Sequence, residues 1–187
     1  MVKYSLAMRV KNIARSGWMM RGISPSDSET VSSHIFEVAF LSMLIADRLR
    51  DTGVDVDISK VIKLALIHDV TESVIGDIVR SVKENIVNSQ LLEERALREL
   101  GLESYLDLYQ ELAEGRTLES QLVKICDNLA TLLQGLRYVN KGHTSVIDLV
   151  ESTKSRVEEI LKSEQIKEET RRILSEVVMK LLISEEF

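Results

Sequence analysis

The sequence predicts an all-α fold, a compact bundle of many helices in a chain of 187 residues. Hydrophobic residues make up 44% of the chain and charged residues 29%, with a single proline, which is typical of a globular, mostly helical protein. Aromatic residues reach only 4%, and β-branched runs separated by turn signals are missing. Both observations argue against an all-β architecture.

Taken in order, the apolar periods predict helices at residues 3–14, 31–50, 58–69, 72–79, 84–100, 103–113, 118–140, 144–163 and 167–183. Several of these periods are followed by a glycine, as helix ends commonly are: Gly53, Gly101, Gly115 and Gly142. Asp57 is the expected N-cap of the third helix. The longest non-helical stretch, residues 15–30, carries the only tryptophan and the only proline. Loops of this length inside a compact domain are often functional.

No repeat, low-complexity tract or linker divides the chain, so we expect a single domain over residues 1–187. The two C-terminal helices, within residues 141–187, are expected to be structural and could also supply a subunit contact. The net charge of −6 argues against a nucleic acid polymer as partner. The lone cysteine, Cys126, excludes an intramolecular disulfide and is expected to be a buried thiol. Without a signal-like or membrane-spanning apolar stretch, we expect no membrane partner and a cytoplasmic location.

The chemistry centres on residues 64–77, LALIHDVTESVIGD. Asp69 falls on the same helical stripe as Ile58, Ile62 and Ala65, which predicts that it faces the core. Desolvating a carboxylate there costs roughly several kcal/mol unless a cation or good donors compensate. Because the adjacent His68 offers a nitrogen ligand, a metal ion is the simplest candidate. The alternative is a buried His–Asp pair held by a neighbouring arginine or a helix end.

Two other predicted helices also carry a metal-ligand residue among apolar neighbours. His34 lies on the core stripe of helix 31–50, and Asp127 lies in LVKICDNLATLL. Taken singly, His34 could be a satisfied core histidine, and Asp127 could pair with Lys124 or Arg137 or bond a helix end. Taken together, two imidazoles and two carboxylates suit one divalent ion with positions open for water and substrate. The predicted ligand set is His34, His68, Asp69 and Asp127.

This H…HD…D pattern in a helical domain resembles the HD-domain phosphohydrolases. The fuller pattern is similar to the branch of HD-domain 5′-nucleotidases that acts on deoxyribonucleoside monophosphates. Its segments here are Ser32-Ser33-His34, His68-Asp69-Val70-Thr71-Glu72, Gly76-Asp77 and Asp127, with Arg15 and Trp18 in the N-terminal loop. The resemblance covers about residues 5–140. Two residues separate Arg15 from Trp18, which resembles archaeal and eukaryotic relatives; in bacterial members the arginine and tryptophan are adjacent.

The resemblance implies metal-dependent hydrolysis of deoxyribonucleoside 5′-monophosphates by a homodimer. The donor set accepts Mn, Co, Ni, Zn, Cu or Fe. Glu72 is expected to orient or deprotonate the attacking water, and Asp77 to protonate the leaving 5′-oxygen. Arg15 offers a planar fork to the phosphate, and Trp18 could stack on the nucleoside or crowd the 2′-position. Weaker phosphate candidates are Arg21, Arg80 and Lys83.

Each of these residues also has a structural alternative. Glu72 could be a solvated helical residue, Asp77 a cap of the next helix, and Trp18 a pin of the first helix to the core. The whole chain could also hydrolyse another small phosphate ester, a nucleoside triphosphate or a signalling nucleotide. A further alternative, a non-catalytic nucleotide-sensing module, is disfavoured because the set of acids and imidazoles is complete.

Overall fold

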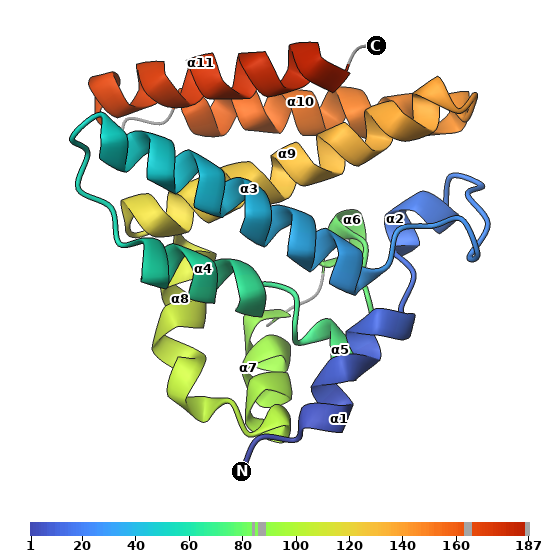
Figure 1. Ribbon diagram of the computed structural model, residues 1–187. Helices are drawn as coiled ribbons and strands as arrows, with labels where there is room; N and C mark the ends of the chain where they lie inside the picture. The colour runs from blue at the N-terminus through green and yellow to red at the C-terminus, as the bar shows by residue number, and fades with distance from the viewer. Residues whose placement is uncertain (84, 86–88, 163–165, 186–187) are drawn as a thin grey trace.

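A computed structural model describes residues 1–83, 85, 89–162 and 166–185 (Figure 1). The described residues form helices joined by turns, and their one isolated β-bridge pairs Ala14 with Thr30. The elements are α1 (Tyr4–Ala7), the 3-10 helix η1 (Met8–Asn12), α2 (Ser16–Met19), α3 (Val31–Asp51), α4 (Ile58–Ile67), α5 (Glu72–Ile75), α6 (Arg80–Lys83), α7 (Ser89–Leu100), η2 (Glu103–Tyr105), α8 (Leu106–Glu114), α9 (Leu118–Asn140), η3 (Thr144–Val146), α10 (Ile147–Leu161) and α11 (Glu168–Glu185). The all-α prediction is confirmed.

Helices α3, α4 and α9 pack together at the centre of the molecule. Their facing stripes supply most of the main core cluster, including Val38 and Ile45 of α3, Leu64 of α4, and Leu129 of α9. In Figure 1, α10 and α11 lie along one side of α9, while α7 and α8 lie beyond α4. The core therefore sits between three helices that carry, or lead directly to, the predicted metal ligands.

The longest helices match the predicted ranges closely, whereas the short ones differ. The predicted helix 58–69 ends at Ile67, so His68 and Asp69 lie in the turn that follows α4. The predicted helix 72–79 is wrong beyond Ile75, because Gly76 adopts φ 79°, a left-handed conformation that favours glycine and ends the helix. Residues 84 and 86–88 of the predicted helix 84–100, and residue 163 of helix 144–163, lie outside the described residues.

The predicted loop of residues 15–30 contains the short helix α2 and is tied to the rest of the fold at both ends. The backbone N–H of Arg15 donates to the carbonyl of Glu29 (2.8 Å). The Tyr138 hydroxyl of α9 accepts from the Glu29 N–H (2.8 Å) and donates to the Asp27 carbonyl (3.0 Å). The Trp18 ring packs edge-on against Tyr138, with 5.1 Å between the ring centroids. The ends of this loop are therefore joined to each other, and the loop is fixed against α9.

The C-terminal helices complete the core. Val157 of α10 and Leu174 and Val178 of α11 belong to the same buried cluster as Leu129. One cluster thus extends over both the motif-bearing part of the chain and its C-terminal helices, while the single-domain assignment stays a prediction. Cys126 is buried as expected. Within the described residues, no helix has the length and apolarity needed to cross a membrane.

The role of burial can be tested on one helix with a matched pair of leucines. In α7, Leu97 is fully buried, whereas Leu91 is 44% exposed. We expect Leu97→Ala to lower the free energy of unfolding by about 2–5 kcal/mol, because it leaves a cavity in the buried interior. Leu91→Ala should change it by less than about 0.5 kcal/mol. Urea unfolding followed by circular dichroism measures both, and equal losses would show that α7 does not pack as described.

Candidate functional site

The four predicted metal ligands converge at one point between α3, the turn after α4, and α9. The Nε2 atom of His34 lies 2.9 Å from Asp127 Oδ1 and 3.8 Å from Asp69 Oδ2. The Nε2 atom of His68 lies 3.2 Å from that same Asp69 oxygen. One ligand atom from each of His34, His68 and Asp127 lies within 4.8 Å of the others. This arrangement is a candidate site for a metal ion.

The orientation of His68 fits a metal ligand. Its Nδ1 lies 2.6 Å from the Ala65 carbonyl and donates to it, which leaves the lone pair of Nε2 facing Asp69. That Nε2 atom is buried and has no hydrogen-bond partner. A lone pair beside a carboxylate oxygen is repulsive unless a proton or a cation lies between them. Two imidazole nitrogens and two carboxylates are also donors that borderline divalent ions accept, so these residues fit a metal.

Arg15 is the arginine that the alternative interpretation of the His–Asp pair requires. Its Nη1 donates to Asp69 Oδ2 at 2.9 Å, and its Nη2 lies 3.5 Å from Thr131 Oγ1. It therefore compensates part of the buried charge of Asp69. It does not explain the unpartnered Nε2 of His68.

The partners proposed for Asp127 in the alternative interpretation are engaged elsewhere. Lys124 donates to the Ala113 carbonyl at 2.8 Å, and Arg137 pairs with Glu37 at 2.9 Å. Asp127 instead faces His34, with Arg80 at 3.7 Å from its other oxygen. The geometry therefore joins Asp127 to the imidazole cluster.

Glu72 and Asp77 both line the cavity beside this cluster. Glu72 opens α5 and is buried, and its Oε2 atom has no hydrogen-bond partner. The turn at Gly76 brings Asp77 back toward α2, where its carboxylate accepts from the Ser16 N–H. The Ser16 hydroxyl in turn donates to the Asp77 carbonyl at 2.8 Å. Glu72 is thus not a solvated helical residue, and Asp77 is held at the start of α2.

The cavity has a volume of about 320 Å³, within the range of small-molecule sites. Its wall includes Arg15, Trp18 and Asp69, together with Asp127 of the cluster. Further cationic side chains line it: Arg21, Arg80, Lys83 and Arg156. The sequence interpretation missed Arg156, because a lone arginine on α10, far along the chain, carries no local signal of the site.

The HD-domain family profile matches residues 7–168 of the chain. The chain belongs to the HD-domain family. The protein named 5′-deoxynucleotidase HDDC2 of Dictyostelium discoideum is 30% identical over 150 residues, which cover 75% of this chain and 77% of that protein. The protein of the same name from Xenopus laevis is 32% identical over 143 residues, covering 71% of this chain and 66% of that protein. A solved structure of a conserved hypothetical protein from Pyrococcus furiosus superposes with a TM-score of 0.81 at 32% identity, over 95% of both chains.

In this HD-domain protein, Trp18 is part of the cavity wall rather than an open stacking surface. The side chain is only 1% exposed. Its indole Nε1 donates to Glu29 Oε2 at 3.0 Å, and its ring packs on Tyr138. Trp18 therefore fixes the loop of residues 15–30 to α9. This role is close to the structural alternative for Trp18, in which it fixes the first helix to the core.

The charges of the cluster stabilise one another. Burial and Arg15 lower the pKa of His34, but the hydrogen bond with Asp127 and the nearby carboxylate of Glu29 outweigh them and raise it to about 9. Burial disfavours charge on Asp127, yet its hydrogen bond with His34 lowers its pKa to about 2. Burial, with Asp69 and Asp77 nearby, raises the pKa of Glu72 to about 10. Asp69 has a pKa well below its usual range, because His68 and Arg15 outweigh its burial.

These shifts predict how the stability of the metal-stripped protein depends on pH. A group whose pKa rises on folding stabilises the fold below its unfolded pKa, and that stabilisation is lost as the pH climbs through the folded pKa. For His34 the window runs from 6.5 to about 9, and Glu72 contributes with the same sign. We expect the free energy of unfolding to fall by roughly several kcal/mol between pH 6 and pH 9, since each unit of pKa shift corresponds to about 1.4 kcal/mol.

Urea titrations in the presence of a chelator measure this dependence. Glu72→Gln serves as the control, since it removes one of the two titrating groups and should show a smaller fall. A free energy of unfolding that rises over the same interval would contradict the charge arrangement.

Proposed function

We propose that this HD-domain protein is a metal-dependent phosphomonoesterase that hydrolyses deoxyribonucleoside 5′-monophosphates to deoxynucleoside and phosphate. The observation that carries the proposal is the convergence of His34, His68 and Asp127 beside a cavity that also presents Glu72 and Arg15. The substrate class is supported by the relatives named 5′-deoxynucleotidase.

We assign His34, His68, Asp69 and Asp127 as the ligands of one divalent ion, which can be Mn, Co, Ni, Zn, Cu or Fe. When bound, such an ion neutralises charge on the phosphoryl group and lowers the pKa of water. The remaining work of the protein is to position substrate and water and to move protons. Phosphoryl transfer depends mostly on such positioning and on charge stabilisation.

Arg15 binds the phosphate in this proposal. Its guanidinium lines the cavity and lies against Asp69, so it reaches the side of the site where a phosphoryl group would sit next to the cluster. A guanidinium can donate two parallel hydrogen bonds to phosphate oxygens. Trp18 forms the adjoining wall and limits the space beside the sugar.

Glu72 orients the attacking water and accepts its proton. Burial and neighbouring acids raise the pKa of its carboxyl to about 10, and positive charge held beside Asp69 would lower it toward the range of a general base. Asp77, which Ser16 holds at the cavity wall near Glu72, is assigned to the leaving 5′-oxygen. In this proposal Glu72 accepts a proton from the water, and Asp77 donates a proton to the leaving oxygen.

A monophosphate fits this site better than a triphosphate. Most of the additional cations on the wall are already matched by protein groups. Arg21 pairs with Asp148 at 2.6 Å, and Lys83 forms a close ion pair with Glu93. Arg80 donates to Asn128 Oδ1 at 3.2 Å. Acidic partners thus neutralise Arg21 and Lys83, and Arg15, which faces the metal cluster, is the residue that we assign to a single phosphate.

The proposal is tested by phosphate release from a panel of ribo- and deoxyribonucleoside monophosphates, each with Mn²⁺, Co²⁺ or Zn²⁺. We expect release from deoxyribonucleoside 5′-monophosphates with at least one of these ions, and none after chelation. Glu72→Gln should retain bound metal while kcat falls by about 10²–10⁴-fold, as expected when a general base is removed. His68→Ala should lose the metal itself.

Two outcomes would refute the proposed function. One is a metal-loaded protein that releases phosphate from no monophosphate of the panel. The other is Glu72→Gln with unchanged kcat, which would remove the residue assigned to the water. Tight nucleotide binding by a parent protein without turnover would instead favour the sensing module.

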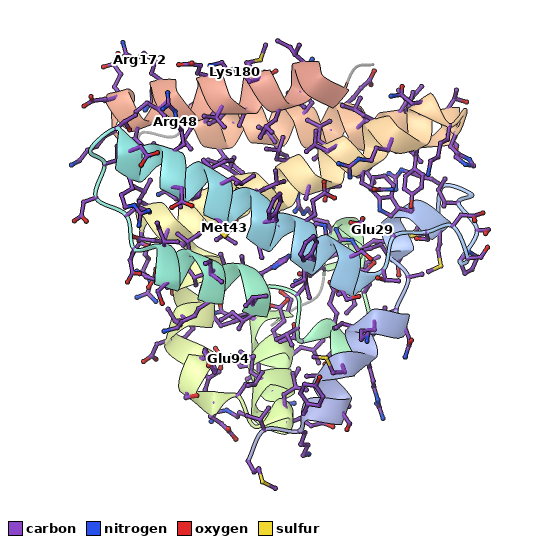
Figure 2. All side chains as sticks on the ribbon, viewed as in Figure 1. Glu29, Met43, Arg48, Glu94, Arg172 and Lys180 are labelled. Carbon is purple, nitrogen blue, oxygen red and sulfur yellow. The ribbon has the colours of Figure 1, made fainter. Side chains whose placement is uncertain are left out.

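We also propose that the protein forms a homodimer through an exposed apolar stripe on α3. Phe36, Phe40 and Leu44 follow one another at four-residue spacing and are 69%, 47% and 44% exposed. The two phenyl rings stack with centroids 6.1 Å apart. Exposed apolar patches often mark interfaces, and a stripe along one helix can pair with its own copy across a two-fold axis. Met43, labelled in Figure 2, lies on the same stretch of α3.

Sedimentation velocity tests the dimer. The parent protein should sediment as a dimer, and the double variant Phe36→Ser with Phe40→Ser as a monomer, because two large apolar groups leave the interface. Leu91→Ser, which changes an equally exposed leucine on α7, should leave the dimer intact. A parent that is monomeric at all concentrations would refute this interface.

A further inference from the structure

We propose that Glu29 is a positioning residue that holds His34 in the tautomer and orientation needed for metal binding. The inference rests on the proposed metal site and extends it to a residue outside the ligand set. Glu29 lies in the loop before α3 (Figure 2), and its side chain is only 4% exposed. A buried carboxylate requires compensating partners. Its partners are what connect it to the metal centre.

The first connection is to the ring nitrogen of His34 that faces away from the cluster. His34 Nδ1 is buried without a hydrogen-bond partner, and Glu29 Oε1 lies 3.6 Å from it. A metal ion bound at Nε2 requires the ring proton on Nδ1. Glu29 Oε1 is then the acceptor that faces this proton, and a small approach of the two groups closes the hydrogen bond. Carboxylates in this relation to a ligating histidine fix its orientation and raise its basicity.

The position of Glu29 follows from the start of α3. Thr30 is the N-cap, and its hydroxyl accepts from the Ser33 N–H at 3.2 Å. Glu29 is therefore the residue before the cap, and His34 is the fourth residue of the helix. Side chains at these two positions pack against each other at many helix starts. The usual apolar pair is here replaced by a carboxylate and an imidazole.

The backbone of Glu29 is held independently of its side chain. Its carbonyl accepts from the Arg15 N–H, and its N–H donates to the Tyr138 hydroxyl, both at 2.8 Å. The other carboxylate oxygen, Oε2, accepts from the Trp18 indole at 3.0 Å. The carboxylate thus bridges the cavity wall and the metal centre. A change of the carboxylate to an amide removes the bridge while the backbone contacts remain.

The test is metal binding by the full-length Glu29→Gln variant, measured by titration with Co²⁺ and Zn²⁺. We expect the dissociation constant to rise by about 10–100-fold, the size of effect usual for such outer partners of a ligand. The visible spectrum of bound Co²⁺ should also shift, because the His34 ring is no longer fixed. Glu37→Gln is the matched control: it removes a carboxylate of α3 that pairs with Arg137, and should stay within about twofold of the parent.

Two spectroscopic measurements test whether the Glu29 carboxylate links Trp18 to His34. Nitrogen-15 shifts of the Zn²⁺-loaded parent should show His34 protonated at Nδ1, with a mixed or displaced signal in Glu29→Gln. Trp18 is the only tryptophan, so its fluorescence should change when metal binds to the parent and respond much less in Glu29→Gln. Trp18→Phe, which removes the indole donor to Glu29 together with part of the ring, should weaken metal binding by a smaller factor.

The outcomes separate the two proposals. If the parent binds metal, and Glu29→Gln binds it with the same affinity and the same Co²⁺ spectrum, the role of Glu29 is overturned while the metal site stands. If the parent binds no metal, the metal site and this inference both fail. Should Glu29→Gln not fold, Trp18→Phe decides: unchanged affinity and an unchanged His34 signal overturn the bridge.

Discussion

The structure depends on burying several charges at the point where α3, α4 and α9 meet. A buried charge is destabilising unless opposite charges and hydrogen bonds surround it, and removing one partner then leaves the other uncompensated. Asp69 forms an ion pair with Arg15, and Asp127 is hydrogen-bonded to His34. The cluster is therefore stable only when all of its side chains are in contact with their partners. The packing of α3, α4 and α9 brings these side chains together.

The residues of the cluster are positioned by hydrogen bonds that fix where their helices begin and how the loop of residues 15–30 is attached. Thr30 caps α3 just before His34, and Asp57 caps α4, its side chain accepting from the Lys60 N–H at 3.0 Å. A reciprocal capping box of Thr117 and Ser120 opens α9 well ahead of Asp127. The loop of residues 15–30 is tied to α9 through Tyr138. Local capping hydrogen bonds, together with the long-range contact of Tyr138, thus set the placement of side chains that meet over long sequence separations.

The sequence predicts the parts of this arrangement that depend on periodicity. The long helices at 31–50 and 118–140 agree with α3 and α9 to within a residue, because their apolar stripes run through many turns. The convergence of His34, His68 and Asp127 also follows from acids and imidazoles placed among apolar neighbours. The helix end at Ile67, set by how the next turn packs, could not be predicted in this way. The contact of Arg15 with Asp69 spans 54 residues and depends on tertiary packing, which periodicity does not encode. Glu29 left one readable signal, an acid before a helix cap with a histidine at the fourth helical residue.

The contact of Arg15 with Asp69 and a phosphate role for Arg15 are compatible when the charges of the site are considered together. A divalent ion and a phosphate dianion carry equal and opposite charge, so binding both leaves the balance around Asp69 unchanged. In that state the ion would compensate Asp69, and the guanidinium would become available to the phosphate without a net change in buried charge. Arg15 needs only a short movement, because its guanidinium already lines the cavity beside Asp69. The same argument explains why a lysine would be a poor substitute: its single point charge cannot present a planar pair of donors to the phosphate.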